Sequence, residues 1–132
     1  MTNNWSQLSV RALAYVGDAV FELHVREQSL RAVAGQVDAL HKATIARVSA
    51  PSQALVALQI EPFLETEEKS VFRRARNHKG IGTSSRASAQ EYRLSTAFEA
   101  VLGYVYLKND PTRLATLLSI ADTLMENSTH AR

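Results

Sequence analysis

The chain has 132 residues, a net charge of +2 and no cysteine. Residues 1–132 are enough for a single domain with an independent core. The lack of cysteine excludes disulfides, thiolate zinc sites and cysteine nucleophiles. The sequence shows neither the pattern of a signal peptide nor an apolar run of about 18 residues, so we expect no membrane contact and a cytoplasmic location.

Apolar residues recur at helical spacing along the whole chain, and no period-two alternation is long enough to predict a strand. The sequence therefore predicts an all-α fold with short loops. Thr66 is the expected N-cap of a middle helix, Asp110 and Pro111 are typical of a helix start, and residues 128–132 are expected to form a frayed tail. The predicted helices span residues 8–30, 37–48, 52–60, 66–77, 89–108 and 111–125.

One predicted helix contains the segment LAYVGDAVFE, residues 13–22, which is apolar around most of its circumference and is expected to be buried. Asp18 interrupts this apolar segment. Because burying an unpaired carboxylate is unfavourable, a basic partner or a metal ion is expected beside Asp18.

A second segment repeats this anomaly. Residues 96–107, TAFEAVLGYVYL, form another nearly all-apolar helix that contains one acid, Glu99. Two acids in two core helices suggest a shared site.

The pair has two interpretations. In the first, Asp18 and Glu99 meet around Mg²⁺ or Mn²⁺, which carboxylate oxygens bind well, and Gly17 and Gly103 let the two helices approach closely. In the second, Arg26 neutralises Asp18, and Glu99 caps or pairs elsewhere. The second is the commoner arrangement for a single aspartate in a core helix, and composition and periodicity alone do not overturn it.

Other catalytic motifs are incomplete. Gly80 and Gly82 resemble the start of a dinucleotide-binding loop, but no strand precedes them and the third glycine is missing. The histidines lack the HExxH spacing, and no serine lies in a GxSxG motif. Conventional hydrolase chemistry and dinucleotide binding are therefore not supported.

The charge of the side chains changes from negative to positive in the middle of the chain. Acidic residues gather at residues 61–68, and basic residues dominate residues 73–93, where Glu91 alone opposes them. A basic segment on a nearly neutral protein is a candidate phosphate-binding edge. Alternatively, the acids begin a helix and the bases end it, as the helix dipole favours.

Two segments resemble a known family. AYVGDAVFE, residues 14–22, resembles the signature motif of the ribonuclease III family, and residues 96–107 resemble its second acidic motif, in the same order. FRRARNHKG, residues 72–80, followed by EYRLSTAFEAVLGYVYL, residues 91–107, resembles the Mini-ribonuclease III branch, whose catalytic domain lacks a double-stranded-RNA-binding domain.

The resemblance implies an all-α helical bundle like the ribonuclease III endonuclease domain. It implies a homodimer that holds double-stranded RNA in a valley between subunits, with one Mg²⁺-dependent site per subunit cutting each strand. It further implies an endoribonuclease that matures precursors of large-subunit (23S) ribosomal RNA.

The resemblance also assigns residues. Asp18 stands at the signature aspartate and Glu99 at the second-motif glutamate, and both would be catalytic ligands of Mg²⁺, with Mn²⁺ as an alternative. Ala14 and Thr96 stand where larger family members have two further acids. Glu22, one turn beyond Asp18, is an expected outer-shell group or a structural residue.

In this family, RNA binding would rely on the shape and phosphates of the duplex. The residues expected to contact the RNA backbone are Arg73, Arg74, Arg76, Asn77, Lys79 and Arg86. Because two acids are replaced, one alternative is a degenerate domain that binds structured RNA or a ribosomal partner without cutting. A further alternative is a helical dimer that serves only as a protein adaptor.

Overall fold

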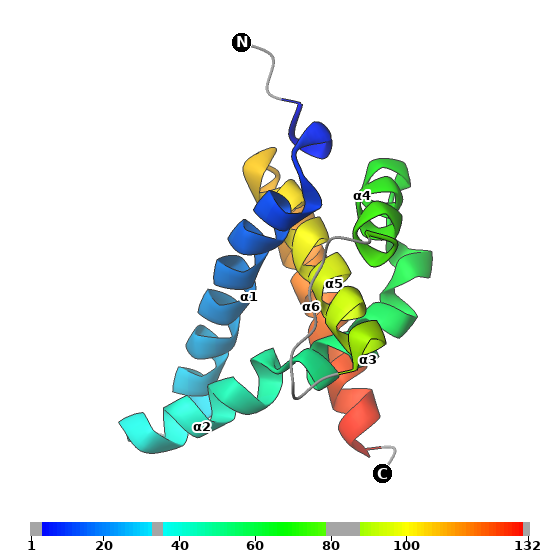
Figure 1. The fold of residues 1–132 in the computed structure, drawn as a ribbon. Coiled ribbons are helices and arrows are strands. Elements are labelled where there is room, and N and C mark those ends of the chain that lie inside the picture. Colours follow the sequence, from blue (N-terminus) through cyan, green and yellow to red (C-terminus); the bar gives the residue numbers. More distant parts are fainter. Residues whose placement is uncertain (1–3, 33–35, 79–87, 131–132) are drawn as a thin grey trace.

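The computed structural model describes residues 4–32, 36–78 and 88–130. In these residues the regular structure is helical and no strand occurs, which confirms the all-α prediction (Figure 1). The helices are η1 (Trp5–Gln7), α1 (Val10–Ala32), α2 (Val37–Val48), α3 (Ala50–Ile60), η2 (Glu61–Phe63), α4 (Thr66–Arg76), α5 (Ala89–Leu107) and α6 (Pro111–His130). None of these described helices combines the length and the apolar character needed to cross a membrane.

The predicted and observed helices differ mainly at their ends. The sequence does not predict η1 and η2, because three residues are too few to show a periodic pattern. The N-cap of α4 is Glu65, so the predicted N-cap Thr66 is wrong by one residue. The Glu68 carboxylate accepts a hydrogen bond from the Glu65 N–H at 2.9 Å, which fixes this start of the helix. Helix α6 runs to His130, past the predicted end at Met125 and into the segment expected to fray.

Helix α5 is the centre of the bundle and packs against α1, α3, α4 and α6 (Figure 1). Its residues are buried from Leu94 to Phe98 and again from Ala100 to Val105. A helix that is apolar all round needs neighbours on every side. One of these contacts joins Phe98 to Phe21 of α1, whose rings meet edge to face with centroids 5.1 Å apart.

Helices α1 and α5 touch through their backbones where Gly17 crosses Gly103. A Cβ on Gly17 would overlap the carbonyl oxygen of Glu99, and a Cβ on Gly103 would overlap the carbonyl oxygen of Leu13. Glycine alone leaves room for this contact. The predicted close approach of the two helices is confirmed, and it sets Asp18 of α1 beside Glu99 of α5.

Polar contacts fix both ends of α5. At its start the Ser88 hydroxyl accepts from the Glu91 N–H at 3.1 Å, and the Glu91 carboxylate accepts from the Ser88 N–H at 3.2 Å. Beyond its end, Asn109 has a φ of 61°, which turns the chain into α6. Asp110 Oδ1 then accepts from the Arg113 N–H at 3.1 Å, so the predicted helix start at Pro111 is confirmed.

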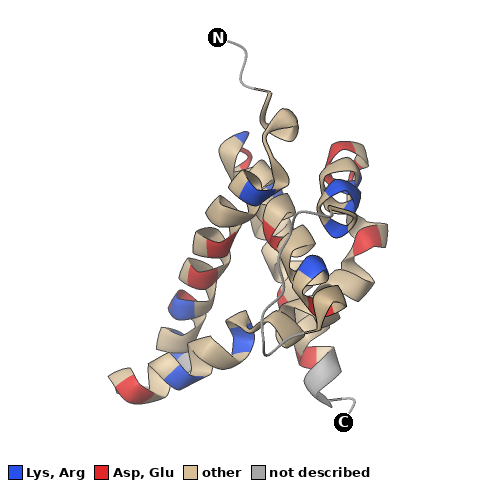
Figure 2. Ribbon diagram, viewed as in Figure 1, with Lys and Arg blue, Asp and Glu red and all other residues tan. Residues whose placement is uncertain are grey.

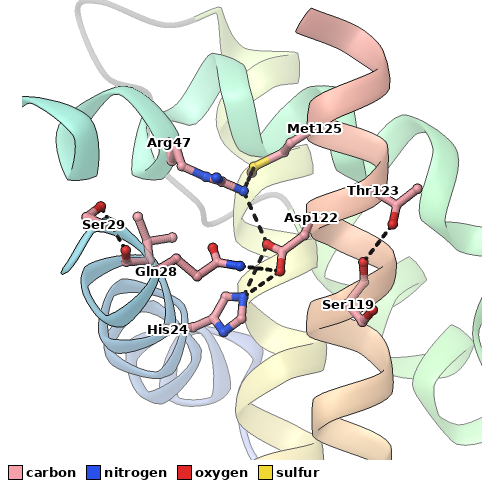
Figure 3. A network of polar contacts seen from close by, with 9 residues as sticks. His24, Gln28, Ser29, Arg47, Ser119, Asp122, Thr123 and Met125 are labelled. Carbon is pink, nitrogen blue, oxygen red and sulfur yellow. Dashed lines mark hydrogen bonds and ion pairs between the residues drawn. The ribbon is translucent and has the colours of Figure 1, made fainter. Parts of the chain in front are cut away.

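A polar network joins α6 to α1 and α2 (Figure 3). Asp122 of α6 accepts from His24 Nε2 at 2.9 Å and from Gln28 Nε2 at 2.6 Å, both on α1. Arg47 Nη2 of α2 reaches the other Asp122 oxygen at 3.2 Å. Three helices therefore share one carboxylate.

A buried ion pair joins α4 to the start of α6. The side chain of Glu68 is 0 % exposed, and Arg113 binds it with two donors, Nε to Oε2 at 2.9 Å and Nη2 to Oε1 at 2.7 Å. Arg113 Nη2 also donates to the carbonyl of Phe63 at 2.8 Å. Burial raises the pKa of Glu68, but the hydrogen bonds and charge of Arg113 outweigh this effect and hold that pKa below 4.5.

We predict that replacing Arg113 with Met lowers the free energy of unfolding by about 3–5 kcal/mol at neutral pH, because Glu68 is left buried without a cation. Urea denaturation measures this loss. Since the pKa of Glu68 is depressed in the folded protein, the pair stabilises it above pH 4.5, and this contribution disappears as pH falls through the lowered pKa. The wild type and the variant should therefore converge in acid.

The matched control combines Arg113→Met with Glu68→Gln, which removes the unpaired charge and should recover part of the stability. Equal stability of the wild type and the single variant at pH 7 would show that the ion pair does not hold α4 on α6.

Candidate active site

A pocket of about 290 Å³ lies between α1 and α5. Residues three and four apart on a helix share a face, which is the spacing of the lining residues on each helix. Asp18 and Glu99 both line this pocket, so two acids far apart in the sequence meet at one place. The lining residues are Arg11, Ala14, Tyr15 and Asp18 from α1, and Tyr92, Thr96 and Glu99 from α5.

The two acids differ in their exposure. Asp18 is exposed at the pocket, so the expectation that it is buried is wrong. Gly17 makes the buried contact of this turn, which leaves Asp18 facing the opening. The alternative partner Arg26 binds Glu22 at 3.2 Å, one turn apart on α1. Glu22 therefore has a structural contact on the helix surface.

Glu99 is partly buried, and this burial is the largest of the causes that raise the pKa of its carboxyl to about 9. The hydrogen bond with Asp18 and the charge of Asp18 raise this pKa further, while the amide of Gln53 opposes the shift. At neutral pH Glu99 is therefore protonated and donates to Asp18.

This donor set fits a divalent cation. A cation can take the place of the proton on Glu99, because it offsets the repulsion between the two carboxylates. In the described part of the chain no group of three or more His, Cys, Asp or Glu side chains could hold a metal ion. A metal bound by Asp18 and Glu99 would keep several waters, which is the usual coordination of Mg²⁺.

Ala14 and Thr96 line the same pocket. The Thr96 hydroxyl donates to the carbonyl of Tyr92 at 2.8 Å, so it is engaged within its own helix. The two positions that bear acids in larger family members thus contribute a methyl group and a bonded hydroxyl here. The pocket has less negative charge as a result.

Four residues at the site are not predicted by the sequence analysis. Arg11 and Tyr15 precede Asp18, and Tyr92 precedes Glu99, by whole helical turns, so their spacing is the signal that could have found them. Gln53 comes from α3, and no pattern in the sequence connects it to Glu99. Its side chain is buried, with Nε2 donating to the carbonyl of Val48 at 2.9 Å.

The arginines at the end of α4 have partners within the chain. Arg73 Nε lies 2.6 Å and Arg76 Nη1 3.2 Å from the Glu61 carboxylate. Arg74 has a different environment, since its guanidinium donates to the carbonyls of Ser6 and Leu8, each at 2.6 Å. Arg74 therefore anchors the segment before α1.

The rest of the expected RNA-binding set lies at or beyond the end of α4. Asn77 is exposed at the C-cap, where its N–H donates to the Arg73 carbonyl at 3.0 Å. Lys79 and Arg86 lie outside the described residues. The described basic residues of α4 are visible in Figure 2.

Residues 11–110 match the family model of the ribonuclease III domain. The chain is 45% identical over 115 residues to Mini-ribonuclease 3 of Gloeobacter violaceus, covering 87% of this chain and 83% of the relative. It is 39% identical over 123 residues to Mini-ribonuclease 3 of Clostridium tetani, covering 92% and 82%. A crystal structure of a protein from Fusobacterium nucleatum aligns with a TM-score of 0.77 at 31% identity, covering 89% and 93%. The chain therefore belongs to the ribonuclease III family of endoribonucleases and, within it, to the Mini-ribonuclease III branch.

Proposed function

We propose that this chain is an Mg²⁺-dependent endoribonuclease that hydrolyses double-stranded RNA, with Asp18 and Glu99 as the metal ligands. The observation that supports it is the meeting of these two carboxyl groups in one open pocket. Mn²⁺ would suit the same oxygen ligands. Further, we propose a cytoplasmic precursor of 23S ribosomal RNA as the natural substrate, on the resemblance alone.

The residues of the pocket would have different roles in the reaction. Asp18, which is exposed, can reach both a metal and the incoming RNA, whereas Glu99 is only partly exposed and is hydrogen-bonded to Gln53. When bound, a divalent cation supplies an activated water and a positive charge beside the scissile phosphate. The backbone contact of Gly17 with α5 holds Asp18 and Glu99 close to each other on two packed helices.

We predict that Asp18→Asn and Glu99→Gln each slow cleavage of duplex RNA by about 100-fold or more, since each removes a ligand charge while keeping the side-chain shape. Both variants should still retain the duplex on a filter. Gel assays with and without Mg²⁺ measure cleavage, and they compare a stem of a 23S precursor with an unrelated duplex. Glu126→Gln, at an exposed position of α6 outside the pocket, is the control.

The replacement of two acids by Ala14 and Thr96 favours a second candidate, a domain that holds structured RNA without cutting. The cleavage and filter assays described above distinguish the nuclease from the binding domain. Retention of the duplex without any cleavage by the wild type would support the binding domain, and cleavage that persists in both variants or without metal would contradict the nuclease proposal.

We also propose that the end of α4 contacts the RNA backbone through Arg73, Arg76 and Asn77, together with Lys79 and Arg86. The guanidinium groups of Arg73 and Arg76 are partly exposed and share one carboxylate, so each can exchange Glu61 for a phosphate. Arg74 is left out of this proposal because it is held by two carbonyls.

We predict that replacing both Arg73 and Arg76 with Gln weakens duplex binding and reduces the slope of log affinity against log salt by about 2. Arg74→Gln is the matched variant, and it should leave the slope unchanged while lowering the free energy of unfolding by about 2 kcal/mol. Fluorescence anisotropy at several salt concentrations gives the slopes. Identical slopes for the wild type and the double variant would rule out this contact surface.

A homodimer is the third part of the proposal, and the outer face of α1 is its interface. Tyr15 is 82 % and Leu23 59 % exposed, and both project from one side of the helix with Ala19 between them. A two-fold axis across this face would bring the exposed Tyr15 and Leu23 side chains of the two copies together, so the face can pair with itself. The active-site pocket, which Tyr15 also lines, would then adjoin the interface.

We predict that Leu23→Glu converts a dimer into a monomer in sedimentation velocity, because it buries a charge in the interface. Leu58→Glu provides the control, since Leu58 of α3 is 62 % exposed and lies on another helix. A wild-type protein that sediments as a monomer, or a Leu23→Glu variant that stays dimeric, would contradict this interface.

A further inference from the structure

The pocket contains a single cation among its lining residues, all of which the structure describes. Asp18 and Glu99 are acids, Arg11 is a base, and the other four lining residues are uncharged. A phosphodiester is an anion, and carboxylates repel it. Arg11 is therefore the lining residue whose charge favours the entry of a nucleic-acid strand.

The position of Arg11 is unfavourable for the stability of α1. It is the second residue of the helix, where the dipole favours anions, and the first turn contains no acid. Ser9 caps this end, with its hydroxyl accepting from the Ala12 N–H at 3.1 Å. A cation here adds nothing to the cap and opposes the dipole.

Arg11 also has no partner among the described residues. It forms neither an ion pair nor a side-chain hydrogen bond in the ranges 4–32, 36–78 and 88–130. In the same ranges Arg47, Arg74 and Arg113 bind carboxylates or carbonyls. A free guanidinium at a helix start that favours anions is therefore available to a phosphate.

We propose that Arg11 binds a backbone phosphate of the RNA strand that enters the pocket, and so positions this strand over Asp18 and Glu99. Arg11 precedes Asp18 by two helical turns, about 10 Å along α1, and projects into the same pocket. The strand would thus be held at one end of the pocket by Arg11 and cut at the other. This inference rests on the proposed cleavage of duplex RNA and names a positioning residue for it.

The test compares Arg11→Ala and Arg11→Lys with Arg31→Ala, an exposed arginine in the last turn of the same helix. Binding of a duplex RNA is measured by fluorescence anisotropy without divalent metal and across a range of salt. Arg11→Ala should bind about tenfold more weakly, with a salt slope smaller by about 1. Arg11→Lys should keep the slope because it keeps the charge, and Arg31→Ala should match the wild type.

Thermal melting separates this role from a structural one. Because a cation in the first turn opposes the dipole, Arg11→Ala should melt at the wild-type temperature or up to about 4 °C higher. A lower melting temperature, or wild-type affinity and slope in Arg11→Ala, would overturn the proposal. Cleavage with Mg²⁺ is measured separately, so a wild type that binds but never cuts would refute the nuclease function while the slopes still decide the role of Arg11.

Discussion

The contact between the backbones of α1 and α5 is the constraint on which the site depends. Neither Gly17 nor Gly103 can accept a Cβ without displacing the opposite backbone. Because no side chain separates the helices there, the residues next to the crossing have fixed neighbours. Asp18 and Glu99 are held together by the scaffold, so the proposed active site needs no flexible loop to assemble it.

The short separation of Asp18 and Glu99 also determines the electrostatics of the pocket. Burial and the neighbouring Asp18 raise the pKa of Glu99 to about 9, so without a cation Glu99 keeps its proton at neutral pH. The absence of carboxylates at positions 14 and 96 limits the negative charge. Arg11 at the other end of the pocket gives it a positive side, which suits the proposed binding of a metal at one end and of a phosphate at the other.

The sequence predicts the helices because they follow from local patterns, whereas these patterns leave the pairing of the two acids open and the resemblance to the ribonuclease III family favours it. An apolar helix with one acid is visible in the letters alone, and residues 89–107 lie close to their predicted bounds. The exposure of Asp18 could not be predicted in this way, since it depends on which residues of α1 pack against α5. The partners of Arg74 and Gln53 depend on tertiary packing, which periodicity does not record.

The network around Asp122 can form only late in translation, because Asp122 lies in the last helix. His24 and Gln28 lie near the start of the chain, whereas their acceptor lies 98 and 94 residues further on. While the ribosome is still making the chain, these groups and Arg47 must remain hydrated, because the carboxylate that joins them has not yet been translated. The N-terminal half should therefore stay loosely assembled until α6 leaves the exit tunnel, and docking of α6 then completes the fold.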